Sequence, residues 1–278
     1  MFEIELDIFS GRPNPRWTLN AAEDKEFLTR LLDRAVPIAP ISSREGLGYR
    51  GFICTATGNT AATLQARHLP TSFRVRDGLA QSIDSSTETW LRYTGHDVAV
   101  PDAADSAIRQ GTSAKAGADP AAVLRRHRLY FTSSTDFTEW NGSHQGSNNC
   151  YNYASNSITD TFAQPGRGSG EMYHAITADE IHKAALRDGY LDDLDQSTKR
   201  RNLHVGYCIW PGVDYHWYRQ TKPMDGEVRW THKPGGTAAR NYDDSGHYIT
   251  DPSTCDRGPY TIWGGFMFNP GRMNKVAR

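Results

Sequence analysis

The opening segment alternates between apolar and acidic side chains, which is the pattern of a β-strand with one buried face. In residues 2–8 the even positions are apolar and the odd positions are acidic, so Asp7 is expected on the solvent-facing side. A helix is predicted next, because Asn20 and Glu23 have the spacing of a capping box and apolar residues follow at helical intervals. The other elements predicted before residue 98 are a Gly-rich strand over 47–56 and a short helix over 86–93.

The second half of the chain has the pattern of helices followed by an antiparallel sheet. Thr177 and Glu180 again have capping-box spacing, and Gly189 ends the apolar helical run that follows them. Strand patterns then occur over residues 215–220, 228–232 and 260–268. Because helices and strands are segregated rather than alternating, the predicted fold class is α+β.

Residues 99–119 differ in character from the segments on either side. Small and polar side chains dominate, and no large apolar residue follows Ile108. This composition is typical of a linker or a mobile surface loop. Asp119–Pro120 then has the chemistry of a helix start. We therefore expect a small α+β domain over residues 1–98 and a second domain over residues 120–278.

Composition narrows the class of protein. The chain has 278 residues, which fits one large domain or two small ones. Its formal net charge is -1, so the chain lacks the positive electrostatic field that nucleic-acid binding needs. No apolar stretch approaches the roughly 18 residues of a membrane helix. We expect no nucleic-acid partner and no membrane partner. Because the first residues resemble a strand rather than a signal peptide, we expect a cytoplasmic protein, or a secreted one if a signal peptide was removed.

Cys150 has the local context best suited to chemistry. A polar, Gly-containing loop precedes it and residues 151–158 can form a helix, so its thiol would lie at a helix N-terminus. There the free amides and the helix dipole lower a thiol pKa and favour the nucleophilic thiolate. The same amides, with a side-chain donor from Gln145 or Asn149, would bind an oxyanion. The other interpretation is a buried, inert thiol.

A thiolate nucleophile needs a base, and two histidines lie on the predicted strands downstream. His216 is the better candidate for the base, because its aromatic neighbours would form the walls of a cleft. His232 would then orient the imidazole of His216. An even-length hairpin loop would point His232 to the opposite face, whereas a three-residue loop or a bulge at Gly226 would place both histidines on one face. The alternative orienting residues are Asp243, Asp244 and Asp251.

Two metal sites are conceivable in the same region, and neither is favoured. Residues 241–246 resemble the start of a calcium loop, but Pro252 stands where the bidentate glutamate belongs. A zinc site formed by His216, His232 and Asp251 lacks the short ligand spacing of known zinc sites. We therefore expect no metal and no cofactor.

The order of Cys150, a helix, His216 on a strand and His232 on the next strand resembles the papain-like cysteine peptidases and amidases, especially their compact NlpC/P60 and CHAP-type branch. In that family the cysteine is the nucleophile, the histidine is the base and a polar residue orients the imidazole. The resemblance covers residues 140–268 and implies a papain-like domain with a helix and an antiparallel sheet. The asparagines that precede Cys150 depart from the aromatic or small residues of the family's pattern.

The leading hypothesis is therefore a cysteine-nucleophile amidohydrolase or acyltransferase. Cys150 would attack the carbonyl of a peptide or small amide and form a thioester, with His216 as base and His232 or Asp243 as orienting residue. Water as the acceptor would make the protein a peptidase, and an amine would make it a transferase. The alternative is a non-catalytic protein of the same fold, whose aromatic cleft binds a peptide or a carbohydrate.

Overall fold

The computed structural model describes residues 1–33, 36–41, 46–75, 85–113, 135–192, 203–221, 229–271 and 274–276. The described chain divides into two compact units. The first unit comprises residues 1–8, 14–33, 36–41, 49–75 and 85–113. The second unit comprises residues 9–13, 46–48 and the described residues from 135 onward. Each unit combines helices with one antiparallel sheet, so the predicted α+β class is confirmed.

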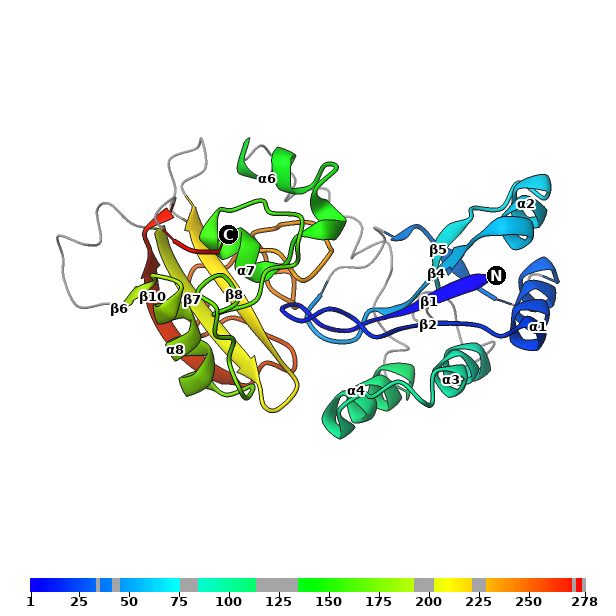
Figure 1. Ribbon diagram of the computed structural model, residues 1–278, viewed down its shortest axis with the longest axis horizontal. Helices are drawn as coiled ribbons and strands as arrows, with labels where there is room; N and C mark the ends of the chain where they lie inside the picture. Colours follow the sequence, from blue (N-terminus) through cyan, green and yellow to red (C-terminus); the bar gives the residue numbers. More distant parts are fainter. Residues whose placement is uncertain are drawn as a thin grey trace. The chain divides into compact units, whose positions relative to one another are not determined.

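The first unit has a five-stranded sheet in the order β2-β1-β4-β5-β3 (Figure 1). Its strands are β1 (Phe2–Asp7), β2 (Arg16–Thr18), β3 (Ile38–Ala39), β4 (Gly51–Ala56) and β5 (Ser72–Val75). Its helices are α1 (Ala21–Leu32), α2 (Gly58–Ala66), α3 (Ser85–Thr94) and α4 (Asp102–Ser113). The predicted capping box of α1 is confirmed, because Asn20 and Glu23 each accept a hydrogen bond from the other's backbone amide.

The helix α4 lies where a linker was predicted over residues 99–119, and that prediction is wrong for residues 102–113. Two apolar side chains four residues apart, Ala104 and Ile108, are buried and give the helix an inward face. The backbone oxygen of Pro101 accepts from two amides of the first turn. The rest of the predicted linker, with the helix start predicted after it, lies outside the described residues.

A buried charge cluster lies at the end of β1. Asp7 is 3% exposed, and its carboxylate lies 2.6 Å from the guanidinium of Arg50 and 2.8 Å from that of Arg74. Burial alone would raise the pKa of Asp7, but the two guanidinium groups outweigh it and hold this pKa far below its usual value. The strand alternation predicted Asp7 in solvent. The Asp7 carboxylate is instead buried, where it pairs with the guanidinium groups of two buried arginines.

The second unit has a five-stranded sheet in the order β6-β10-β7-β8-β9 (Figure 1). Its strands are β6 (Leu191–Asp192), β7 (Leu203–Trp210), β8 (Asp214–Thr221), β9 (Arg229–His232) and β10 (Ile262–Asn269). Its helices are α6 (Thr135–Trp140), the 3-10 turn η2 (Gln145–Ser147), α7 (Cys150–Ser155) and α8 (Ala178–Arg187). Within the described ranges of the chain, no helix is both long enough and apolar enough to cross a membrane.

The two faces of this second sheet have different coverings. On one face a buried apolar cluster joins the strands to α7 and α8. Its members on the strands are Val205, Tyr207, Ile209, Tyr215, Trp217 and Met267. On the other face the ring of His216 contacts the rings of Tyr218, His232 and Tyr260. The sheet therefore separates a mainly apolar layer from a layer that contains histidines.

Residues 9–13 belong to the second unit, where they are bound by Asp214 at the start of β8. The Asp214 carboxylate accepts from three backbone amides of this segment at 2.6 to 3.3 Å, and from the Tyr260 hydroxyl at 2.6 Å. Gly11 lies so close to the ring of Tyr215 that a Cβ would be 2.4 Å from it, which only a glycine avoids. One buried carboxylate thus fixes the path of this segment.

Candidate functional site

Cys150 is the first residue of α7, as the sequence predicts. Asn149 is the N-cap, and its side-chain oxygen accepts from the amides of Tyr151 and Asn152. The side-chain nitrogen of Asn149 donates to two backbone oxygens, each at 2.7 Å. Both polar atoms of this side chain therefore bind the protein's own backbone, which leaves Asn149 no role as the predicted oxyanion donor.

The thiol of Cys150 is enclosed within the second unit. The residue is 0% exposed, and Sγ lies 3.9 Å from the backbone oxygen of Tyr215. Burial raises the pKa of Cys150 well above its usual value and the charge of Asp214 adds to this, while a hydrogen bond from the Trp217 amide opposes it. The helix expected to lower this pKa has only six residues, and burial outweighs its dipole. The expected thiolate is therefore corrected to a neutral, buried thiol.

Labelling with iodoacetamide is expected to modify Cys255 alone in the folded protein. Cys54, Cys150 and Cys208 are 0% exposed, whereas Cys255 is partly exposed. Burial raises the pKa of Cys255 to about 12, so its labelling should be slow at pH 8 and accelerate above pH 9. Peptide mass spectrometry measures this, with labelling in urea as the control in which all four thiols react. Modification of Cys150 in the folded protein below pH 7 would contradict the burial.

His216 and His232 lie in direct contact, with Nε2 of His216 2.8 Å from Nδ1 of His232. The register pairs Tyr218 of β8 with His232 of β9, which places both histidines on one face. Nε2 of His232 is 2.9 Å from both the Tyr242 backbone oxygen and Nε of Arg240. Burial, followed by the charges of Arg240 and His216, lowers the pKa of His232 well below its usual value. His232 is therefore held as a neutral imidazole in buried contact with His216.

Acidification below pH 6.5 is expected to destabilise the second unit through His232. Its pKa in the folded state is lowered, so the unfolded chain, with a pKa of about 6.5, binds more protons. This contribution to stability is complete above pH 6.5 and is lost as the pH falls towards the folded pKa, by about 1.4 kcal/mol per pH unit. Urea unfolding at pH 7.5 and 5.5 measures the slope. Equal stability at both pH values would show that His232 protonates freely in the folded state.

The histidine pair and the thiol lie on different faces of β8. Tyr215 and Trp217, on either side of His216, pack in the same buried cluster as Cys150. Successive residues of a strand point to opposite faces, so the side chain of His216 points away from that cluster. This arrangement does not supply the thiolate–imidazole pair that nucleophilic catalysis requires. The aromatic neighbours that were expected to wall a cleft are themselves 0% exposed core residues.

Gln145 and Asp243, the remaining predicted site residues, have structural contacts of their own. The backbone oxygen of Gln145 accepts from the buried ammonium of Lys233 at 2.5 Å. The carboxylate of Asp243 accepts from three backbone amides of the loop that follows it. Among the predicted site residues, His216 and His232 therefore lie in contact, whereas Asp243 stabilises a turn through its hydrogen bonds to backbone amides. In the parts of the chain that the structure describes, no group of three His, Cys, Asp or Glu side chains is arranged to hold a metal ion.

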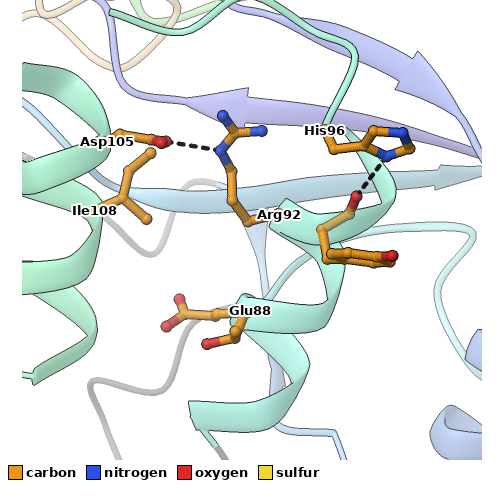
Figure 2. Close-up of a pocket in the computed structure, with 7 residues that line it drawn as sticks. Glu88, Arg92, His96, Asp105 and Ile108 are labelled. Atoms are coloured by element: carbon orange, nitrogen blue, oxygen red, sulfur yellow. Dashed lines mark hydrogen bonds and ion pairs between the residues drawn. The ribbon is translucent and has the colours of Figure 1, made fainter. Parts of the chain in front are cut away.

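A pocket of about 370 Å³ lies in the first unit, between α3 and α4 (Figure 2). It is lined by Glu88, Thr89, Arg92, Tyr93, His96, Asp105 and Ile108. The sequence does not predict this pocket, because one of its walls is α4, whose small and polar residues are typical of a linker. The available signal was Tyr93 and His96, two ring-bearing residues spaced three apart at the end of a predicted helix.

The charged residues of the pocket are fixed in place. Nε of Arg92 donates to Asp105 at 2.8 Å and so connects the two helices, as Figure 2 shows. Glu88 is 2% exposed and accepts from the Tyr49 hydroxyl at 2.9 Å. Ile108 is 4% exposed and contributes an apolar surface beside Asp105. The pocket thus combines ordered acceptors, one ordered donor and an apolar wall.

Comparison with known proteins links the chain to a curated sequence. It is 48% identical over 123 residues to the insoluble matrix shell protein 1 of Ruditapes philippinarum. The matched stretch covers 44% of this chain and 80% of the length of that protein. No family model and no solved structure matches the chain, so the resemblance to the papain-like fold stays a prediction.

Proposed function

Because the chain belongs to the family of the insoluble matrix shell protein 1, we propose that it is a secreted, non-catalytic structural protein that is retained in an insoluble matrix outside the cell. The observation that carries this proposal is the 48% identity over a stretch that covers 80% of that relative. The relative's name describes a component of an insoluble shell matrix. What the proposal transfers to this chain is the role of an insoluble matrix component, rather than a particular shell.

The same relationship contradicts the hypothesis of a cysteine-nucleophile amidohydrolase, peptidase or acyltransferase, and the enzyme hypothesis is withdrawn. The geometry of the second unit agrees with the correction. Cys150 is enclosed and its thiol is held neutral, while the side chain of His216 lies on the other face of the strand. The alternative interpretation, a protein that binds without catalysing, is the better supported of the two.

Sequential extraction of the material that the source organism deposits outside its cells tests the proposal. The chain is expected to remain in the residue after washing with saline and then with detergent, and to dissolve only in a denaturant. Detection with an antibody gives the fraction in each extract, and an unrelated secreted enzyme serves as the control that saline should release. Recovery of the chain mainly in the saline extract, or inside the cells, would overturn the matrix role.

A further inference from the structure

We propose that Cys208 and Cys255 are oxidised to a disulfide when the chain is secreted, so that the loop between β9 and β10 is joined covalently to the second sheet. In the structure both cysteines are free thiols. The proposal rests on the proposed function, because disulfides form and persist in oxidising surroundings outside the cell, whereas thiols in the cytosol are kept reduced.

Cys208 lies on the face of the second sheet that carries His216, here called the histidine face. Its neighbours in β7, Tyr207 and Ile209, belong to the apolar cluster on the opposite face, and successive strand residues alternate between faces. The register pairs Cys208 with His216 of β8 and with Trp263 of β10. Because Cys208 is 0% exposed, its thiol can react only with a group that the protein itself brings to this face.

The turn that carries Cys255 is held over the histidine face. The ring of Trp263 extends across this face, since it lies 6.4 Å from the ring of Tyr218. The guanidinium of Arg257 lies 5.8 Å from the ring of Trp263, and it also donates to the backbone oxygen of Pro252 at 2.9 Å. One arginine side chain thus connects the turn to the sheet, and it does so beside the strand position opposite Cys208.

The two thiols lie close to each other and to the hydroxyl of Tyr218. Burial raises the pKa of Cys208 well above its usual value, Arg257 opposes this, and the thiol of Cys255 adds to it. Burial also raises the pKa of Tyr218, and both thiols add to that shift. The pKa of Cys255 is raised to about 12 by burial, with Tyr218 opposing the shift and Asp243 adding to it. Each of these three groups therefore acts on the other two, as groups in one cluster do.

Cys255 is the thiol that an external oxidant reaches first, because it is partly exposed whereas Cys208 is enclosed. The oxidant is a second disulfide. The thiolate of Cys255 attacks one sulfur of that disulfide, so that a mixed disulfide forms and one thiol leaves. The thiolate of Cys208 then attacks the sulfur of Cys255, and the second thiol leaves. One disulfide is thereby reduced to two thiols, which take up the two protons that the cysteines lose.

The guanidinium of Arg257 favours this exchange, because it lowers the pKa of both thiols against the effect of burial. A thiolate is the attacking form in each step, and a nearby cation increases its fraction. The bridge would close a loop of about 50 residues and so restrict the unfolded chain, which should raise the Tm of the second unit by about 8 °C.

Oxidation of the purified full chain by glutathione disulfide tests the proposal. The chain is first reduced, freed of reductant and then incubated with the probe at pH 8, and its thiols are counted in urea. The wild type is expected to fall from four free thiols to two. A peptide map without reductant should show the Cys208 peptide linked to the Cys255 peptide. The Tm should rise by about 8 °C and return on reduction.

Cys255→Ala changes a partly exposed residue, so the fold should tolerate it. This variant should keep its remaining thiols free and show no rise in Tm with glutathione disulfide. The matched control is Cys54→Ala, which removes a buried thiol from the first unit and should form the bridge as the wild type does. Retention of all four thiols by the wild type, a lasting glutathione adduct on Cys255, or a different pairing overturns the proposal.

The same peptide map, applied to the chain extracted from the source organism, separates this proposal from the matrix role. A chain that stays in the insoluble residue with Cys208 and Cys255 both as free thiols overturns the bridge alone. A chain that carries the bridge but is released by saline overturns the matrix role alone.

Discussion

Replacing Asp214 with asparagine is expected to lower the free energy of unfolding of the second unit by about 3 kcal/mol. The Asp214 carboxylate is 0% exposed and accepts from three backbone amides of residues 9–13 and from the Tyr260 hydroxyl. An asparagine keeps the shape but presents an NH₂ group to donors that need an acceptor, so at least one buried amide loses its partner. Burial raises the pKa of Asp214, and the hydrogen bonds from Tyr260 and the segment oppose that shift.

Urea unfolding followed by tryptophan fluorescence measures this effect, because five of the seven tryptophans lie in the second unit. The matched control is Asp179→Asn, which removes an exposed carboxylate from its pairing with Lys183. Such surface pairs contribute little, so the control should change stability by less than about 0.5 kcal/mol. Equal effects of the two substitutions would show that residues 9–13 do not depend on Asp214.

Replacing Asp7 with asparagine is expected to lower the free energy of unfolding of the first unit by about 3–5 kcal/mol, because it removes the carboxylate that pairs with two buried guanidinium groups. Arg50 and Arg74 are each 1% exposed, and both lie within 2.8 Å of the Asp7 carboxylate. Hydrogen exchange of the amides of β1 and β4, read by mass spectrometry, reports on this unit separately. The control is Glu3→Gln on the same strand. The Glu3 carboxylate is exposed, so this substitution should change the free energy of unfolding by less than about 0.5 kcal/mol.

The pH dependence gives Asp7 a second signature. Its pKa is lowered in the folded state, so its contribution to stability is present above the unfolded value of about 3.9 and is lost as the pH falls towards the folded pKa. The wild type should therefore lose stability below pH 4, and Asp7→Asn should lose less over the same range. Parallel acid profiles for the two proteins would contradict a charged Asp7 between the arginines.

The elements that carry strong local signals could be predicted from the sequence, and those that depend on distant partners could not. Asn20 with Glu23 marked the start of α1, and the polar loop before Cys150 marked the start of α7. The helix α4 was missed, since its buried stripe contains a small residue, Ala104. The strand alternation of β1 is correct, yet it predicts Asp7 in solvent. The burial of Asp7 depends on two arginines that lie more than forty residues away in the sequence, which the local pattern cannot reveal.

In the candidate site too, features that depend on neighbouring residues could be predicted, and features that depend on distant residues could not. The shared face of His216 and His232 follows from strand parity once the register of β8 and β9 is known, but the sequence pattern alone does not fix that register. The state of Cys150 could not be inferred from its neighbours in the chain. The decisive effects are burial against β8 and the charge of Asp214, sixty-four residues further along. Local context predicted a helix start and, wrongly, a reactive thiol.

Retention of Cys150→Ala in the insoluble residue, compared with that of the wild type, tests the central claim most directly. A thiol acyltransferase that cross-linked itself into the matrix would need its sulfur as the nucleophile that forms the transient thioester, whereas a binding protein needs no thiol. With each form expressed in the source organism and its folding checked by thermal unfolding, both are expected in the residue in equal fractions. Release of the folded Cys150→Ala protein by saline, with the wild type retained, would contradict a non-catalytic role.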